Sequence, residues 1–306
     1  MAGPDLTLGL VGLGAFGEAI GRRLVRGGFP LMVFDIASGP LRYFVMKNEG
    51  EVALSPRVMA ETCNVVLTVL PSVDAARATV FGPDGLAGGF RPGSILIEMG
   101  HSAASAAKEQ MAELVARGVA VLEAPARGTP VDAKKGKLVI PVAGDTAAVE
   151  RVMPVLTVLG EKITATGPAG SAETMAVLAG AVHAAATLAA AEILQLAERR
   201  GIAPAAFLEF CAGQGTLGAA IVEALRPRET PRSLAASHTI GAVLDDLDAT
   251  LALARTDGLS LQQTELCREL WAALGRDRGP DDDHTAVVRW LATRPKPEPP
   301  GGAAGS

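Results

Sequence analysis

The chain has 306 residues, enough for two domains with sizeable cores, and 49% of them are hydrophobic but only 4% aromatic. The net charge is −5 at pH 7 with no basic block, which argues against a nucleic-acid partner. Cys63, Cys211 and Cys267 lie far apart and show no metal-binding or redox spacing. We therefore expect no metal site and free thiols in a reducing cytoplasm. The apolar N-terminal run indicates a strand rather than a signal peptide.

A glycine motif follows the first predicted strand. The apolar run Leu6–Val11 predicts the strand, and Glu18–Gly27 predicts the helix that comes after it. Between them, Gly12, Gly14 and Gly17 have the spacing G-x-G-x-x-G. Such glycines permit a tight turn, close approach of a pyrophosphate and close packing of the helix on the strand. The position between a strand and a helix indicates a dinucleotide site, with phosphates bound at the helix N-terminus.

An acid completes this motif. The second apolar run, Leu31–Asp35, ends in a carboxylate 21 residues after Gly14, where a dinucleotide ribose is normally bound. Because no arginine directly follows Asp35 to accept a 2′-phosphate, we expect NAD rather than NADP. The alternative is that Asp35 only caps the next helix.

Strands and helices alternate as far as Ala165. This order predicts an α/β domain with a doubly wound, mostly parallel sheet. Ligands of such sheets bind beyond the carboxyl ends of the strands. After the first two, the predicted strands are Asn64–Leu70, Ser94–Glu98, Val119–Glu123, Leu138–Ala143 and Ile163–Ala165, with a short one near Val52. The segments expected to face a ligand are Pro71–Ser72, Met99–Ser102 and Ala124–Thr129.

From Gly170 onward the pattern is helical. Ser171–Arg200 predicts one long helix, whose polar residues, including His183, favour a buried helix over a membrane span. Its small residues suggest close contact across a homodimer or homotetramer. We expect a Rossmann domain over residues 1–168, an all-helical substrate and dimerisation domain over 169–294, and a disordered tail over 295–306. The further predicted helices are Pro204–Gly213, Leu217–Leu225, Ser237–Thr256, Gln262–Leu274 and Thr285–Thr293.

These motifs, in this order, resemble the β-hydroxyacid dehydrogenase family, which includes 3-hydroxyisobutyrate and 6-phosphogluconate dehydrogenases and has imine reductases as relatives. The resemblance rests on GLGAFGEAIGRRL, VVLTVLPS, IEMGHSA, EAPARGTPVDAKKGKL, GSAETMAVLAG and DDLDATLALA, and it extends from about Leu6 to Leu291. It implies that a Rossmann domain binds NAD or NADP. The cofactor contacts that it implies are Gly12, Leu13, Gly14, Ala15, Phe16, Gly17, Asp35, Leu70 and Pro71.

The resemblance also assigns substrate binding to two loops, with contacts from Ser102, Arg127, Gly128 and Thr129. Arg127 replaces the serine of the family's S-G-G segment, and a guanidinium can bind a carboxylate through two hydrogen bonds. The alternative for Arg127 is a structural salt bridge. The lysines that follow, Lys134, Lys135 and Lys137, are expected in a solvated loop.

The chain departs from the family at the catalytic position. The family's lysine, the general acid and base for the carbonyl–alcohol pair, falls on Ala176, and its paired asparagines fall on Ala179 and Gly180. The serine of the family's other substrate segment falls on Gly100. Reduction of a carbonyl by hydride needs a proton donor, and an alanine cannot be one.

Four side chains are candidates for the missing donor. Glu173 and His183 share a helical face with Ala176, His101 follows a strand end, and Asp245 replaces a lysine of the family's K-D-L motif. Each has a structural alternative: helix-dipole stabilisation for Glu173, a core histidine for His183, and solvated positions for His101 and Asp245.

The sequence thus predicts an NAD(P)-dependent oxidoreductase that transfers hydride to or from a small carbonyl, hydroxy or imine substrate without the usual lysine. The alternative is a catalytically impaired NAD(P)-binding protein that acts as a sensor or a scaffold.

Overall fold

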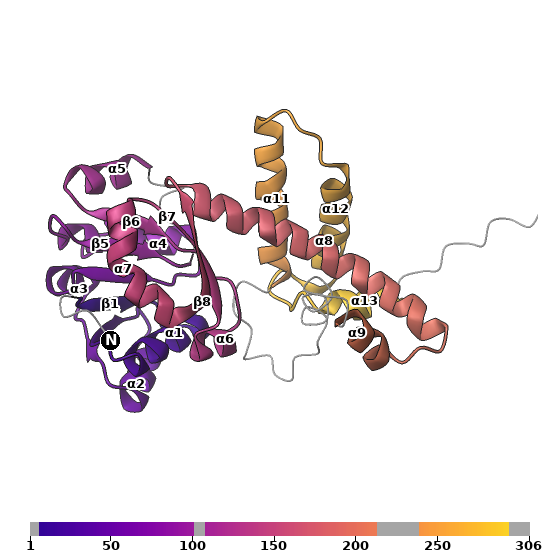
Figure 1. The fold of residues 1–306 in the computed structure, drawn as a ribbon, viewed down its shortest axis with the longest axis horizontal. Helices are drawn as coiled ribbons and strands as arrows, with labels where there is room; N and C mark the ends of the chain where they lie inside the picture. The colour runs from indigo at the N-terminus through magenta and orange to yellow at the C-terminus, as the bar shows by residue number, and fades with distance from the viewer. Residues whose placement is uncertain (1–5, 101–107, 213–238, 294–306) are drawn as a thin grey trace, which may run out of the picture. The chain divides into compact units, whose positions relative to one another are not determined.

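The computed structural model describes residues 6–100, 108–212 and 239–293 (Figure 1). His101, Ser102, the predicted helix Leu217–Leu225 and the tail lie outside these residues. The chain divides into two compact units inside one helix: the first ends at Ala176 and the second begins at Val177. We call them the sheet unit and the helical unit. The start of that helix bonds to the sheet unit through the N–H of Gly170 and the carbonyl of Ala176.

The sheet unit is built on eight strands in the order β3-β2-β1-β4-β5-β6-β7-β8. Neighbouring strands pair in parallel apart from β6 and β7, which meet in antiparallel fashion at Glu123 and Ala143. The prediction of a doubly wound, mostly parallel sheet is confirmed. The strands are β1 Leu8–Val11, β2 Leu31–Phe34, β3 Glu51–Val52, β4 Val65–Thr68, β5 Ile95–Glu98, β6 Ala120–Glu123, β7 Leu138–Ala143 and β8 Gly160–Gly167.

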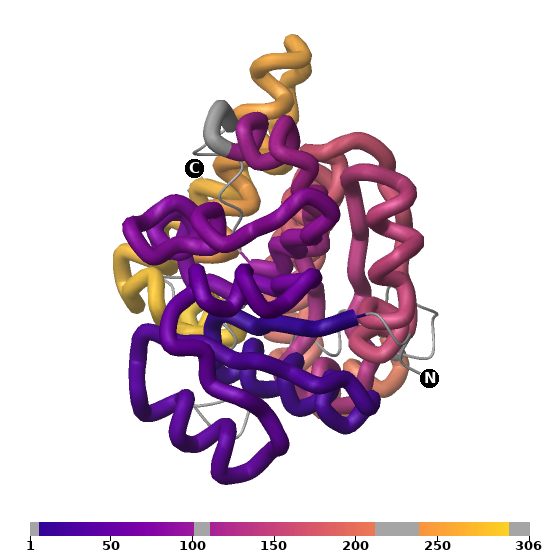
Figure 2. The backbone as a smooth tube through the Cα atoms, turned by 90° about the vertical axis from the view of Figure 1, so that its left-hand side faces the viewer, coloured from indigo at the N-terminus to yellow at the C-terminus, as the bar shows by residue number. Residues whose placement is uncertain are grey.

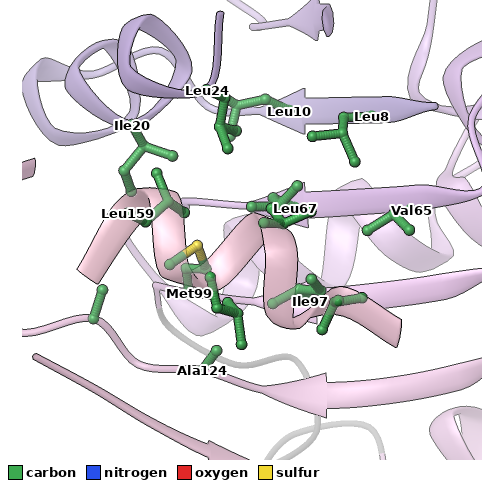
Figure 3. Packing of buried hydrophobic residues seen from close by; sticks show 14 of the residues in the cluster. Leu8, Leu10, Ile20, Leu24, Val65, Leu67, Ile97, Met99, Ala124 and Leu159 are labelled. Carbon is green, nitrogen blue, oxygen red and sulfur yellow. The ribbon is translucent and has the colours of Figure 1, made fainter. Parts of the chain in front are cut away.

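Helices cover both faces of this sheet. Successive strand residues point to opposite faces, so Val65 and Leu67 of β4 pack on one side and Val66 on the other. The first side faces α1 and α7, and Figure 3 shows part of its packed side chains. The second side faces α3, α4 and α5, and Figure 2 shows the backbone of the whole unit as a tube. The helices are α1 Ala15–Arg26, α2 Ser38–Lys47, α3 Pro56–Thr62, α4 Val73–Phe81, α5 Lys108–Ala116, α6 Pro130–Lys135 and α7 Thr146–Leu159, with a short 3₁₀ turn, η1, at Leu86–Gly88.

Helix α6 corrects one expectation, because Lys134 and Lys135 are helical rather than part of a loop. Thr129 caps this helix: its hydroxyl accepts the N–H of Asp132, and the Asp132 carboxylate accepts the N–H of Thr129. Such a reciprocal cap satisfies two N–H groups of the first turn. Lys134 Nζ lies 3.3 Å from Glu18 Oε2 of α1. The Thr-Pro-x-Asp sequence at 129–132 is the signal from which this helix could have been predicted.

The helical unit has its own core. Alanines and leucines of α8 pack against α11, α12 and α13, and Trp271 lies fully buried with its Nε1 donating to the carbonyl of Ala184 at 3.3 Å. The small alanine side chains allow the helices to approach closely. The helices are α8 Ser171–Arg199, α9 Pro204–Ala212, α11 Ile240–Thr256, α12 Gln262–Arg278 and α13 Ala286–Thr293.

Helix α8 also has an exposed apolar face. Within the described residues it is the one helix long and apolar enough to cross a membrane, judged by length and composition. Its other face lies in the core of the helical unit, as a core helix requires. The exposed face carries Leu178, Val182, Ile193 and Leu196, and Val182 is 66% exposed.

The three cysteines are free, as expected. Burial raises the pKa of the Cys63 thiol and of the Cys267 thiol to about 11. Both thiols therefore stay protonated and unreactive at neutral pH.

Candidate functional site

The glycine motif forms a turn with open space at the N-terminus of α1. Gly12 has φ +96°, and a Cβ there would collide with the carbonyl oxygen of Val69. A Cβ at Gly17 would collide with the carbonyl oxygen of Gly12, whereas a Cβ at Gly14 would meet no atom of the described residues within 4 Å. Helix α1 begins at Ala15, three residues before its predicted start, and Gly14 caps it without a side chain. The first N–H groups of α1 therefore border a space suited to a pyrophosphate.

Asp35 lies directly after β2 and ties this turn to the strand. Its Oδ2 accepts the N–H of Leu13 at 2.7 Å, and its Oδ1 accepts the N–H of Ala37 at 2.8 Å. The N-cap of α2 is Ala37, so Asp35 is not the capping residue of that helix. The next side chain, Ile36, is 98% exposed, and Leu54 beyond the end of β3 is 88% exposed. These two exposed apolar side chains follow the neighbouring parallel strands β2 and β3.

The end of β4 approaches the end of β5. Leu70 is half-buried and Pro71 exposed, and Ser72 caps α4 by accepting the N–H of Ala75. A Cβ at Gly100 would lie 2.7 Å from the backbone nitrogen of Leu70. Any side chain at position 100 would therefore collide with this backbone.

Three glutamates gather at the carboxyl ends of β5 and β6. Glu98 ends β5 and Glu123 ends β6; they are partners in the strand register and are 1% and 5% exposed. Glu123 Oε1 accepts the N–H of Gly170 at 2.6 Å, just before α8, while its Oε2 is buried without a hydrogen-bond partner among the described residues. Glu173, in the first turn of α8, is half-buried nearby. Burial first, and then the charges of Glu123 and Glu98, raise the pKa of Glu173 above its ordinary value.

Of these three acids, only Glu173 was predicted from the sequence as a site residue. Glu98 and Glu123 are the last residues of the predicted strands Ser94–Glu98 and Val119–Glu123, and this coincidence was the available signal. Strand order was needed to place the two acids side by side.

Arg127 reaches the same turn of α8. Its backbone forms a bridge with Val139, through hydrogen bonds of 2.9 and 3.0 Å, and its side chain is half-buried. Its Nη2 donates to the carbonyl oxygen of Ala176 at 2.8 Å. The guanidinium therefore contacts the backbone of Ala176, the position to which the family resemblance assigns a lysine, and Ala176 contributes only a buried methyl group.

The other substrate-loop residues have structural roles in the described backbone. Gly128 has φ +140°, a conformation that favours glycine, and Thr129 caps α6. Their contact with a substrate stays a prediction.

Two other catalytic candidates, His183 and Asp245, lie in the helical unit. His183 is exposed, and its ring centroid is 5.9 Å from that of the buried His284, whose Nδ1 lies 3.5 Å from Asp283 Oδ1. Asp245 is exposed. Its neighbour Asp246 faces α8, where a Cβ at Gly180 would collide with the Asp246 carboxylate. Glu173 and Arg127 are thus the candidates that the sheet unit brings to one turn of α8.

Metal ligands are not grouped in the described parts of the chain, where no three His, Cys, Asp or Glu side chains are placed to hold a metal ion.

Comparison with known proteins identifies the class. Residues 7–167 match the NAD binding domain of 6-phosphogluconate dehydrogenase, and residues 170–291 match a domain described as the NAD-binding domain of NADP-dependent 3-hydroxyisobutyrate dehydrogenase. The chain therefore belongs to the β-hydroxyacid dehydrogenase family. It is an NAD(P)-dependent dehydrogenase or reductase, which confirms the expected class of cofactor.

Relatives match over nearly the full length. An uncharacterized oxidoreductase of Synechocystis is 29% identical over 92% of this chain and 97% of its own. The 2-hydroxy-3-oxopropionate reductase of Escherichia coli is 27% identical over 94% of this chain and 97% of its own. A solved 3-hydroxyisobutyrate dehydrogenase of Mycobacterium tuberculosis, determined with L-serine, is 25% identical, covers 94% of this chain and 99% of its own, and superposes with a TM-score of 0.76.

The open space at Gly14 leads to a prediction. Gly14→Ala is expected to fold with a stability within about 0.5 kcal/mol of the wild type, because its methyl group meets no atom of the described residues. NADH affinity should fall about tenfold or more, equal to roughly 1.4 kcal/mol, because the methyl occupies pyrophosphate space. Thermal unfolding and titration of NADH fluorescence measure the two effects. Gly17→Ala is the contrasting variant and should lose stability as well. Unchanged NADH affinity in Gly14→Ala would contradict the prediction that the pyrophosphate binds at this turn.

Proposed function

We propose that the protein catalyses NAD(P)-dependent interconversion of a small carbonyl compound and its alcohol, with Glu173 as the proton donor in place of lysine. The observation that carries this proposal is the half-buried position of Glu173 near two buried carboxylates, which raises its pKa, three residues before Ala176. When bound, the nicotinamide supplies or accepts the hydride. The carbonyl oxygen then takes a proton from the Glu173 carboxyl group, and the reverse reaction returns that proton to the carboxylate.

The cluster suits this role because burial and the neighbouring carboxylates raise the pKa of Glu173. A carboxyl group that is buried among other carboxylates keeps its proton to higher pH than one in water, and such groups act as general acids near neutral pH. Glu123 also bonds to the start of α8 and so holds the turn that carries Glu173. The substrate we expect is a small 3-oxo acid or semialdehyde, in line with the name of the Escherichia coli reductase.

An imine is the second candidate substrate, favoured by the alanine at position 176. An iminium ion arrives already protonated, so hydride transfer to it needs no acid at this position. Reduction of a carbonyl should depend on Glu173, whereas reduction of an iminium ion should not, so the effect of removing Glu173 distinguishes the two substrate classes.

The central test is turnover by Glu173→Gln. Wild type is assayed with NADH and NADPH against semialdehydes, 2- and 3-oxo acids and cyclic imines. We expect carbonyl turnover that falls as pH rises through the pKa of Glu173, because only the protonated acid donates. Glu173→Gln should lower kcat about 10²–10⁴-fold and remove this pH dependence. Glu192→Gln, at an exposed position of α8, is the matched control and should behave like wild type.

Stability provides a second readout on the same variants. Since folding raises the pKa of Glu173, its ionisation destabilises the folded state as pH rises through that pKa. Glu173→Gln should therefore raise the melting temperature relative to wild type at pH 8, and the difference should shrink toward pH 4. An equal difference in melting temperature at pH 8 and at pH 4 would contradict a raised pKa of Glu173 in the folded protein. Cofactor binding without turnover on any substrate would instead favour the sensor or scaffold.

For the cofactor we propose NAD over NADP. The Asp35 carboxylate lies at the expected ribose position, and a negative charge there disfavours a 2′-phosphate. The apolar side chains of Ile36 and Leu54 beside it offer no cation to that phosphate.

Asp35→Ala tests the preference. The variant should bind NADH about 1–2 kcal/mol more weakly, the scale of lost hydrogen bonds, and should lose less affinity for NADPH because the repulsive charge is gone. Fluorescence titration with both cofactors measures this. If the variant lost equal affinity for NADH and NADPH, Asp35 would only hold the loop through its hydrogen bonds with Leu13 and Ala37, and it would not select the cofactor.

We also propose that two copies of the chain associate through the exposed apolar face of α8. Leu178, Val182, Ile193 and Leu196 follow helical spacing along one face, and water-exposed apolar stripes of this length mark interfaces. The assembly that we propose is a dimer of this kind or a tetramer built from it. We also propose a cytoplasmic location, because the cysteines are free thiols.

Light scattering tests the association. Wild type should show at least a dimer, and Val182→Glu combined with Ile193→Glu should shift it to a monomer, because charges would be buried at the interface. Glu269→Lys, at an exposed position of α12, is the control. A monomeric wild type would contradict the proposal.

A further inference from the structure

Two departures from the family motifs meet at one point of the structure. The family has a lysine where this chain has Ala176, and a serine where it has Arg127. These positions are 49 residues apart, yet Arg127 Nη2 donates to the carbonyl oxygen of Ala176 at 2.8 Å. The positive charge that is missing from helix α8 is therefore present beside the same turn of the helix, supplied by the segment after β6.

We propose that Arg127 takes over the electrostatic role of the missing lysine, so that its fixed charge stabilises the negative charge that develops on the substrate oxygen during hydride transfer. The inference rests on the proposed function and assigns a second residue to it. The carbonyl carbon gains the hydride, its oxygen gains the electron pair of the broken π bond, and Glu173 then protonates that oxygen. A cation placed beforehand near this oxygen lowers the barrier.

The chemistry of the two cations explains why two residues are needed. A lysine ammonium supplies both a positive charge and a proton. An arginine guanidinium keeps its proton at physiological pH and supplies only the charge. A chain that replaces lysine by arginine at this site therefore needs a separate acid, and Glu173, half-buried near Glu123 and Glu98, lies only three residues before Ala176.

The local structure holds the guanidinium in place. The backbone bridge to Val139 and the cap of α6 by Thr129 define the path of the chain on both sides of Gly128. A Cβ at Gly128 would lie 2.9 Å from Leu138 Cδ2, so this path is tightly packed. Ala176 is 3% exposed, and a lysine there would place a second cation next to the first. Positions 127 and 176 should therefore tolerate one cation between them.

The experiment is a cycle of variants assayed for carbonyl reduction. Arg127→Gln should lower kcat about 10²-fold, with a smaller change in KM, and Arg127→Lys should recover most of that loss because it restores the charge. Ala176→Lys alone should gain no activity. Ala176→Lys combined with Arg127→Ser should exceed both Ala176→Lys and Arg127→Gln. In that double variant, adding Glu173→Gln should cost less than about tenfold, since lysine then donates the proton.

A purely structural role for Arg127 predicts a different result. In that case Arg127→Gln and Arg127→Lys would lower the melting temperature alike and leave the kcat of the folded protein unchanged, which would overturn the inference. If wild type turns over no substrate, the proposed function fails separately. In that case, calorimetry with malonate, an anionic probe, in the presence of NAD tests whether the charge of Arg127 acts on a bound anion. Malonate binding that is lost in Arg127→Gln and kept in Arg127→Lys supports the inference. Equal or absent binding in wild type and both variants overturns the inference.

Discussion

One hydrogen bond connects the sheet to the chemistry that we assign to helix α8. The N–H of Gly170 donates to Glu123 Oε1, which joins the end of β6 to the start of α8. Since a helix is rigid over its first turns, this bond also sets the positions of Glu173 and Ala176 relative to the ends of β5 and β6. Burial raises the pKa of Glu173, and the charge of this same carboxylate, Glu123, raises it further. One side chain thus holds the start of the helix that carries the acid and adds to the rise of its pKa.

In our proposal, the site divides between two residues the roles that the family resemblance assigns to one lysine. Arg127, on the segment after β6, would supply the charge, and Glu173, on α8, would supply the proton. The acid lies near two buried carboxylates, whereas the guanidinium contacts the carbonyl of Ala176 in the same turn of the helix. With this division, the proton donor and the cation can be changed independently, because they are different side chains rather than one lysine amine.

Much of the fold follows from local patterns. Apolar runs, turn glycines and the change from alternating to purely helical segments predicted the sheet, the glycine turn and the long helix. Helix α6 was not predicted, although Thr129 and Asp132 have the spacing of a reciprocal cap. Asp245 was selected as a candidate, while Asp246 is the acid that packs against Gly180. Adjacent positions on a helix differ by about 100° in direction, so pattern matching alone did not select the inward-facing acid.

The sequence by itself determined the class of protein, the class of cofactor and the absence of a lysine at position 176, because these depend on residue identity and on spacing along the chain. The tertiary structure alone decided which side chains meet. Glu98 and Glu123 become neighbours through the pairing of β5 with β6, and Arg127 reaches Ala176 across 49 residues. Burial and proximity of charges set the protonation of a carboxyl group, and both are properties of the folded chain.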